Sequence, residues 1–181
     1  MKNSLTLACL LLLLGLNSNA QDSTSKNGMG FGFHLLQYQD DFGMGVNLVS
    51  PYFVNQKIGI RLKANLMYNQ NVIDGITEWI PYANVSLGII GLGGYVSERI
   101  RLYGEGGVLL LFPPDKLSSQ NVEVGSYGLF GFEFFFSDLG NYFIEIGGVG
   151  TGAKADKIEA SPIYSNGLTI GVGLRYFLSG K

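Results

Sequence analysis

The sequence predicts an all-β fold: an eight-stranded antiparallel transmembrane up-and-down β-barrel with both termini periplasmic. Three observations predict it. The chain of 181 residues contains 27 glycines, and only 14% of its residues are charged against 46% that are hydrophobic. Apolar residues alternate with small or polar ones along nearly the whole chain. No apolar run after the first twenty residues reaches the length of a transmembrane helix, which is about 20 residues.

The first twenty residues have the tripartite pattern of a secretory signal peptide. Lys2 supplies the positive n-region, residues 5–16 form an apolar core, and Ala20 ends a stretch of small residues suited to cleavage. Cys9 lies inside the apolar core, which argues against lipoprotein acylation. Cleavage after Ala20 would remove Cys9, the only cysteine, so the exported protein would have neither a disulfide nor a thiol nucleophile. We therefore expect a signal peptide at 1–20, a short periplasmic segment at 21–27 and the transmembrane barrel at 28–181.

Eight segments alternate with a period of two residues, as strands do. They are 28–39, 42–53, 57–68, 79–95, 99–112, 122–136, 141–151 and 167–178. Most of them reach the length of a tilted membrane strand, about 9–11 residues. The fourth is long enough that we expect a β-bulge near Gly93 and Gly94.

Charged residues well inside these segments all fall on the face opposite the aliphatic one. They are Arg61, Lys63, Arg101, Glu105, Glu123, Glu133, Glu145 and Arg175. Glycines share this face, and small residues between long polar ones suit the narrow lumen of an eight-stranded barrel. A soluble lipocalin-like barrel would instead turn its apolar face inward and its charges toward water. The pattern therefore favours a membrane barrel with charges in its lumen.

Aromatic residues of the apolar face gather near the ends of the segments. One group is Phe42, Tyr68, Trp79 and Phe112, and the other is Phe31, Phe33, Tyr52, Phe134, Phe136, Tyr142 and Tyr176. Two aromatic girdles around an aliphatic band are typical of outer-membrane barrels. The longer connections are expected at 69–78, 113–121 and 152–166, and such barrels place long loops outside the cell. Both termini would then be periplasmic.

Three segments resemble strands of the small outer-membrane β-barrel proteins of the OmpA/OmpX type, particularly the compact porin-like barrels common in Bacteroidota. These segments are 101–107, 143–148 and 171–177. The resemblance covers essentially the whole chain after the leader and implies a Gram-negative outer-membrane protein. It implies outer-membrane lipid and the barrel-assembly machinery as partners. The last strand of this chain resembles the C-terminal assembly signal of such proteins. The residues that carry this resemblance are Gly171, Gly173, Leu174, Tyr176 and Phe177.

The lumenal charges suggest a function for the interior. Their formal sum is zero, and Arg101, Glu133, Glu145 and Arg175 fall in the periplasmic half of the barrel. Charges in a narrow lumen are tolerated only when they are paired and hydrogen-bonded. Our hypothesis is an ion-pair network that plugs the lumen. A gated pore lined by charge is the rival, although eight strands leave little open bore.

Neither a catalytic nor a metal or cofactor motif is apparent. His34, the only histidine, has inward parity, and no serine of matching parity lies beside it for a lipid-modifying enzyme. We expect His34 to be a hydrogen-bonding lumen residue and the protein to be non-enzymatic. The adjacent Asp40 and Asp41 are expected to be solvated in a loop, and a net charge of −2 gives no reason to expect nucleic acid binding.

Small residues on the outward face of three neighbouring strands form a candidate docking groove. They are Gly104, Gly106, Ser126, Gly128, Gly148 and Gly150. Small residues permit close approach of a partner, whereas the alternative is that glycine eases the coiling of a tight barrel. Three function classes follow: a structural or interaction barrel that serves as an accessory subunit of a larger outer-membrane complex, a small pore or surface receptor for solute or glycan, and a lipid-modifying enzyme. We favour the first.

Overall fold

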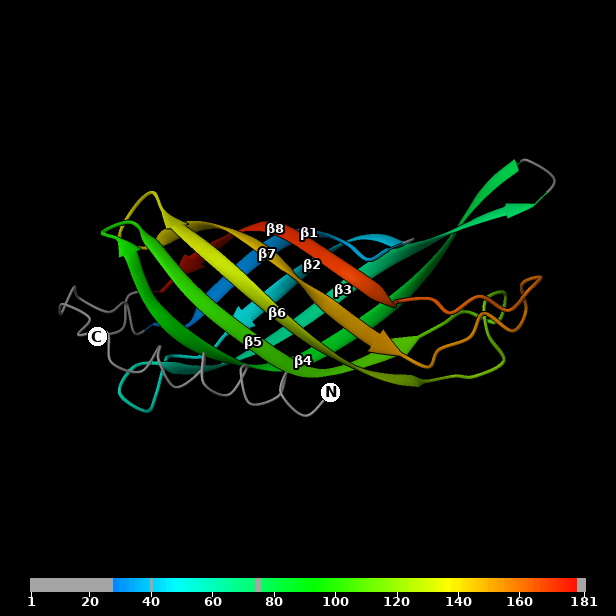
Figure 1. Cartoon of the computed structure of the whole chain (residues 1–181), viewed down its shortest axis with the longest axis horizontal. Helices are drawn as coiled ribbons and strands as arrows, with labels where there is room; N and C mark the ends of the chain where they lie inside the picture. Colours follow the sequence, from blue (N-terminus) through cyan, green and yellow to red (C-terminus); the bar gives the residue numbers. More distant parts are fainter. Residues whose placement is uncertain (1–27, 40, 74–75, 179–181) are drawn as a thin grey trace, which may run out of the picture.

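The eight predicted strands form one closed antiparallel ring (Figure 1). The computed structural model describes residues 28–39, 41–73 and 76–178. The strands are β1 Gly30–Gln37, β2 Asp41–Val49, β3 Ile58–Ile73, β4 Ile76–Ser97, β5 Ile100–Phe112, β6 Glu123–Phe135, β7 Gly140–Thr151 and β8 Gly167–Phe177. Each pairs with its neighbours in the chain, and β1 closes the ring on β8. The predicted eight-stranded antiparallel barrel is confirmed.

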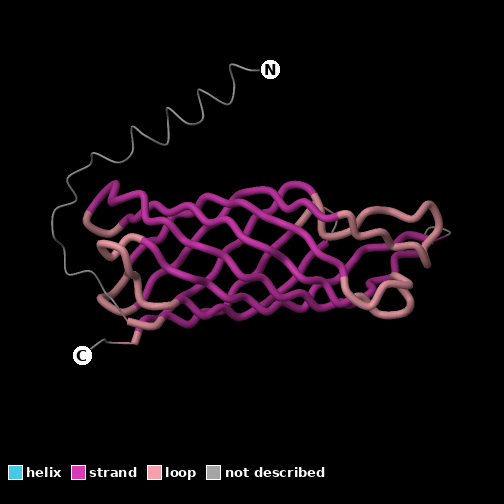
Figure 2. The backbone as a smooth tube through the Cα atoms, turned by 90° about the horizontal axis from the view of Figure 1, so that it is seen from below, coloured by secondary structure: helices cyan, strands magenta, loops and turns pink. Residues whose placement is uncertain are grey.

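The barrel has two unlike ends, and Figure 2 shows the strand lattice between them. We call one the short-turn end, formed by residues 50–57, 98–99 and 136–139, and the other the long-loop end, which carries residues 113–122 and 152–166. The described chain starts and finishes at the short-turn end, where the Leu178 N–H donates to the Met29 carbonyl at 2.8 Å. The expected signal peptide and the segment 21–27 lie outside the described residues. Within the described ranges, no helix has the length and apolarity to cross a membrane.

Strand boundaries differ from expectation at two connections. The second strand ends at Val49 rather than at 53, because the chain then turns through Val54, Asn55 and Gln56, which all have left-handed backbone angles. The loop expected at 69–78 is instead a continuation of β3 and β4, whose hairpin projects beyond the rest of the wall (Figure 1). Its β-branched residues, Val72, Ile73, Ile76 and Thr77, favour extended backbone, so pairing continues where the polar residues suggested a loop.

The bulge expected in the fourth strand is confirmed. The register of β4 against β5 shifts between Leu92 and Gly94, and Gly94 adopts a φ of 115° that favours glycine. A second shift follows between Tyr95 and Ser97. The two irregularities bend the end of this long strand where it approaches the short-turn end.

Exposure alternates along the strands and separates an apolar outside from a mixed inside. In β2 the buried positions include Gly45 and Asn47, whereas Val46 and Leu48 between them are exposed. The outward side chains are aliphatic over most of the wall, with Ile89 62% exposed and Leu168 57% exposed. An apolar surface of this extent requires an apolar environment or a partner.

Inward glycines make room for large side chains of neighbouring strands. A Cβ atom at Gly131 would lie 2.5 Å from the Tyr103 hydroxyl, and one at Gly173 would lie 2.5 Å from Cζ of Phe143. At Gly45 it would collide with the amide oxygen of Asn65. The high glycine content of the inner face therefore follows from the bulk of the tyrosine, phenylalanine and asparagine side chains that share the narrow lumen.

Apolar side chains fill the lumen toward both ends. The larger layer, at the long-loop end, contains Leu36, Tyr38, Met67, Ile80, Tyr82, Leu109, Leu111, Leu117, Val149, Ala153, Ala155 and Tyr164. The smaller layer contains Val49, Tyr52, Ile90, Tyr103 and Phe177. Along β5 the inward residues pass from Leu109 through Glu105 and Tyr103 to Arg101, so charged and apolar levels alternate down the barrel.

Candidate functional site

The central charged level of the lumen joins β3 to β5 and β7. Arg61 Nη2 lies 2.5 Å from Glu145 Oε1 and also forms an ion pair with Glu105. Lys63 Nζ lies 3.3 Å from Glu105 Oε1 and 3.6 Å from Glu145 Oε2. All four side chains are buried. We call Arg61, Lys63, Glu105 and Glu145 the central cluster, in which two cations are balanced by two carboxylates.

Two tyrosines complete the central cluster. The Tyr103 hydroxyl donates to Glu145 Oε1 and the Tyr127 hydroxyl donates to Glu105 Oε1, each at 2.5 Å. The same rings lie against the cations, with Lys63 Nζ 5.0 Å from the Tyr127 centroid and the Arg61 guanidinium 5.5 Å from that of Tyr103. Each carboxylate therefore receives both charge and a hydroxyl donor, as a buried ion pair requires.

A second charged level lies nearer the short-turn end. Glu133 on β6 accepts from Arg101 Nε at 2.6 Å, forms an ion pair with Arg175 of β8, and accepts from Asn141 Nδ2 at 3.1 Å. Arg175 Nε also donates to Asn47 Oδ1 at 3.3 Å. We call Arg101, Glu133 and Arg175 the lower cluster, which holds two guanidinium groups around one carboxylate.

Aromatic rings surround the excess positive charge of the lower cluster. The Arg175 guanidinium lies 4.6 Å from the Phe143 centroid, and that of Arg101 lies 5.0 Å from Phe135 and 5.2 Å from Tyr52. Ring faces attract cations and stabilise a guanidinium that has little access to water. The rings therefore stabilise the charge that Glu133 alone does not balance.

The structure corrects three expectations about these residues. Glu123, expected among the charges of the lumenal network, is half-buried at the long-loop end of β6 and belongs to neither cluster. Glu145 joins the central cluster rather than Arg101 and Arg175. Tyr52, expected in an outward girdle, is 3% exposed and lies inside, because β2 ends before it and the turn folds it over Arg101.

His34 belongs to a chain of hydrogen-bonded amides. Its Nε2 lies 2.7 Å from Asn65 Oδ1, its Nδ1 lies 3.2 Å from Asn47 Nδ2, and Asn65 Nδ2 donates to Asn84 Oδ1 at 2.6 Å. Donation from Nε2 and acceptance at Nδ1 give both ring nitrogens of His34 a partner of the correct kind. The described residues contain no group of three or more His, Cys, Asp or Glu side chains placed to bind a metal.

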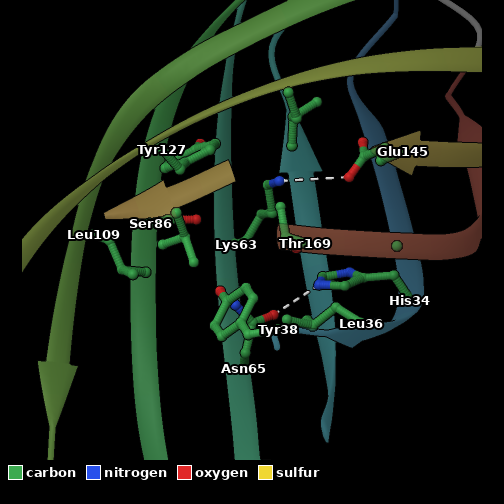
Figure 3. Close-up of a pocket in the computed structure, with 13 residues that line it drawn as sticks. His34, Leu36, Tyr38, Lys63, Asn65, Ser86, Leu109, Tyr127, Glu145 and Thr169 are labelled. Carbon is green, nitrogen blue, oxygen red and sulfur yellow. Dashed lines mark hydrogen bonds and ion pairs between the residues drawn. The ribbon is translucent and has the colours of Figure 1, made fainter. Parts of the chain in front are cut away.

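A small cavity of about 30 Å³ separates the central cluster from the apolar layer of the long-loop end (Figure 3). Lys63, Asn65 and Glu145 line its polar side, and Leu109 and Val149 line its apolar side. A polar cavity of this size holds one or two water molecules and no larger solute.

The outer wall carries the aromatic and small residues that the sequence singled out. Phe31, Phe33, Phe42, Trp79, Phe112, Phe136, Tyr142 and Tyr176 are exposed, and Tyr68 and Phe134 are half-buried. Phe42 pairs with Tyr68, and Phe31 pairs with Tyr176, so each group lies at one level of the wall. In β8, Leu174 and Tyr176 point outward, and Gly171, Gly173 and Phe177 point inward. Their role as an assembly signal stays a prediction.

Five of the six small residues of the candidate groove form two adjacent rows on the outer wall, and the sixth, Gly104, pairs with Phe130 on the other side of the first row. Gly106 of β5 pairs with Gly128 of β6, which pairs with Gly148 of β7. Beside them Ser126 pairs with Gly150, and Gly104 lies two residues from Gly106. A Cβ atom at Gly128 or Gly150 would meet nothing within 4 Å. The glycines of these rows therefore leave the backbone of the wall uncovered by side chains.

Several residues that complete the site escaped the sequence analysis. Tyr103 and Tyr127 share the inward parity of the charges they contact, so alternation could have identified them. Asp41, expected to be solvated, is 2% exposed and accepts three hydrogen bonds at the long-loop end. No local pattern signals its burial, because its partners come from distant segments.

Comparison with known proteins supports the fold. No protein-family model matches the sequence, and no curated protein matches it. The structure is similar to the crystal structure of the N-terminal β-barrel domain of Pseudomonas aeruginosa OprF, with a TM-score of 0.60 and 12% sequence identity. The similarity covers 84% of this chain and 98% of that chain. The two proteins share a barrel architecture of the OmpA-like kind.

Proposed function

We propose that the protein is a non-enzymatic integral outer-membrane β-barrel and that its own side chains close its lumen. Its proposed role is structural or that of an interaction partner for other proteins. The observation that carries the membrane placement is the aliphatic outer wall with aromatic residues at both levels. Such a wall matches the hydrocarbon band and interfacial girdles of an outer-membrane barrel. The long-loop end would face the outside and the chain termini the periplasm.

The proposed closure of the lumen is supported by its successive buried levels. The central cluster, the lower cluster and the apolar layers each cross the bore, and Arg61, Glu133 and Leu111 are 0% exposed. The non-enzymatic role is supported by the surroundings of His34, whose ring nitrogens are both engaged by amides. A serine nucleophile would need one of these ring nitrogens free to act as its general base.

Planar-bilayer recording tests the closed lumen. The protein, purified from the outer-membrane fraction and checked by heat-modifiable gel migration, is expected to give no steady conductance because its ion pairs and apolar layers exclude hydrated ions. A porin in the same bilayers is the positive control. Reproducible conductance from the pure protein would favour the gated pore, and the absence of a gel shift would argue against the membrane barrel.

The accessory-subunit role has its own observation, the double row of small residues on the outer wall. A partner barrel can approach a backbone closely where side chains are missing. The double variant Gly106→Leu and Gly128→Leu is expected to fold normally, since both positions face open space, and to lose the proteins that co-purify with the unmodified chain in mild detergent. Unchanged co-purification would contradict this role. Leucine at Val108, which is already large and outward, is the matched control.

A further inference from the structure

Two long loops cover the long-loop end of the lumen. Residues 113–122 and 152–166, which we call the lid, contribute Leu117, Ala153, Ala155 and Tyr164 to the apolar layer there. The first three are 0% exposed and Tyr164 is 2% exposed. The Tyr164 ring packs edge-on against Tyr82 of β4, with 5.2 Å between centroids. The buried residues of the lid therefore cover the mouth of the barrel, while its other residues face solvent.

The two loops are held to each other as one unit. The Ser119 N–H donates to Asp156 Oδ1 at 2.7 Å, and its hydroxyl also donates to that carboxylate. These donors hold the pKa of Asp156 below its ordinary value, so the carboxylate stays charged at neutral pH. The Lys157 N–H reaches the Leu117 carbonyl at 3.4 Å. A movement of one loop would therefore carry the other with it.

One buried carboxylate attaches this unit to the ring. Asp41 Oδ2 accepts from the Ser165 N–H and from the Tyr82 hydroxyl, each at 2.7 Å, while Oδ1 accepts from Asn69 Nδ2 at 2.6 Å. Ser165 belongs to the lid, whereas Asp41 itself begins β2 and its other partners, Asn69 and Tyr82, belong to β3 and β4. Hydrogen bonds to a charged group are about twice as strong as neutral ones. Asp41 thus joins the lid to three strands of the ring through a single buried side chain.

Backbone strain in the lid depends on that contact. Ser165 has a φ of 51°, a left-handed conformation that costs a non-glycine residue energy, and it is 0% exposed. The Ser165 N–H donates to Asp41 Oδ2, and the Ser165 Oγ lies 2.5 Å from the Tyr82 hydroxyl. Without these contacts Ser165 would relax to a more favourable conformation, and that change would pull the lid away from the barrel mouth.

We propose that Asp41, Tyr82 and Ser165 form a latch that keeps the lid shut, and that breaking it lets the lid open as a unit while the ring and both charged clusters persist. Beneath the lid lies the small cavity lined by Tyr38, Leu109 and Lys63 (Figure 3). Opening would bring water to the central cluster from the long-loop end. This inference concerns the lid alone and does not depend on membrane insertion or on a closed lower lumen.

Cysteine accessibility tests the latch, since the described residues contain no cysteine and Cys9 lies in the expected signal peptide. Ala155→Cys places a thiol under the lid, and Lys154→Cys places one on its exposed surface. In the otherwise unmodified protein we expect a maleimide to label Lys154→Cys rapidly and Ala155→Cys slowly. Adding Asp41→Asn should raise the labelling rate of Ala155→Cys by about tenfold or more, because two or more charged hydrogen bonds are lost, and leave that of Lys154→Cys unchanged.

Heat-modifiable migration of each variant reports the ring separately. Equal labelling of Ala155→Cys and Lys154→Cys without the latch mutation would overturn the closed lid, and continued protection in Asp41→Asn would overturn the latch. If Asp41→Asn fails to fold, Tyr82→Phe decides, because it removes one hydroxyl and keeps the ring packing. A folded Tyr82→Phe with faster labelling supports the proposal. If Ala155→Cys stays protected from the maleimide in Tyr82→Phe, or if the ring of that variant does not fold, the latch is contradicted.

Discussion

Replacing Glu133 by glutamine is expected to lower the free energy of unfolding by about 3–5 kcal/mol, because it leaves two buried guanidinium groups without a counter-charge. Glu133 is the carboxylate of the lower cluster and pairs with both Arg101 and Arg175. Aromatic rings stabilise these cations only in part. The measurement is urea unfolding in detergent or vesicles, followed by the loss of the fast-migrating band on unboiled gels.

Two companion variants make this result specific. Glu123→Gln changes the same chemical group at the half-buried long-loop end of the same strand and is expected to have little effect. Adding Arg101→Met and Arg175→Met to Glu133→Gln should recover most of the lost stability, since a buried ion pair can be replaced by apolar groups. Equal stability of Glu133→Gln and Glu123→Gln would contradict the buried cluster.

Gly107→Ala is expected to destabilise the barrel by about 1–3 kcal/mol or more, whereas the adjacent Gly106→Ala should change stability by less than about 1 kcal/mol. A Cβ atom at Gly107 would collide with the Leu87 carbonyl and lie 2.6 Å from Cα of Gly88. Because these are backbone atoms of the neighbouring strand, no side chain can rotate away. At Gly106 the nearest atom would be 3.7 Å away, at the Tyr127 carbonyl.

The pair Gly147 and Gly148 repeats this comparison on β7. A Cβ atom at Gly147 would lie 2.6 Å from Cα of Leu129, while one at Gly148 would stay 3.8 Å from the Gly167 carbonyl. In thermal unfolding, the two alanine variants at inward glycines should therefore have lower melting temperatures than the two at outward glycines, whichever strand carries them. Equal melting temperatures for the inward and outward variants would show that the lumen is not tightly packed.

Alternation alone predicted the number of strands and the direction of the charged side chains within them, because a two-residue period fixes which face a strand residue occupies. It did not predict which charges meet. Glu145 and Glu133 lie on neighbouring strands with the same parity, yet they join different clusters because strand tilt sets their levels in the barrel.

Positions outside the regular strands were the least predictable. Tyr52 follows the end of β2, so the two-residue period no longer applies to it, and its ring turns inward over Arg101. Asp41 begins β2, but its burial depends on Ser165, a residue more than a hundred positions away in the chain. Contacts of this kind arise only when the loops close over the finished ring.

The seam between β1 and β8 joins Gly30 to Phe177, the two extremes of the described chain. This contact joins residues far apart in the sequence and costs more loop-closure entropy than pairing neighbouring strands, so we expect closure to be the last step of folding. Before β8 arrives, Glu133 has a single guanidinium partner, Arg101, and the lower cluster is neutral. The final strand then brings Arg175 and removes the two open sheet edges together. The strand that we expect to pair last is therefore also the one that gives the lower cluster its surplus of positive charge.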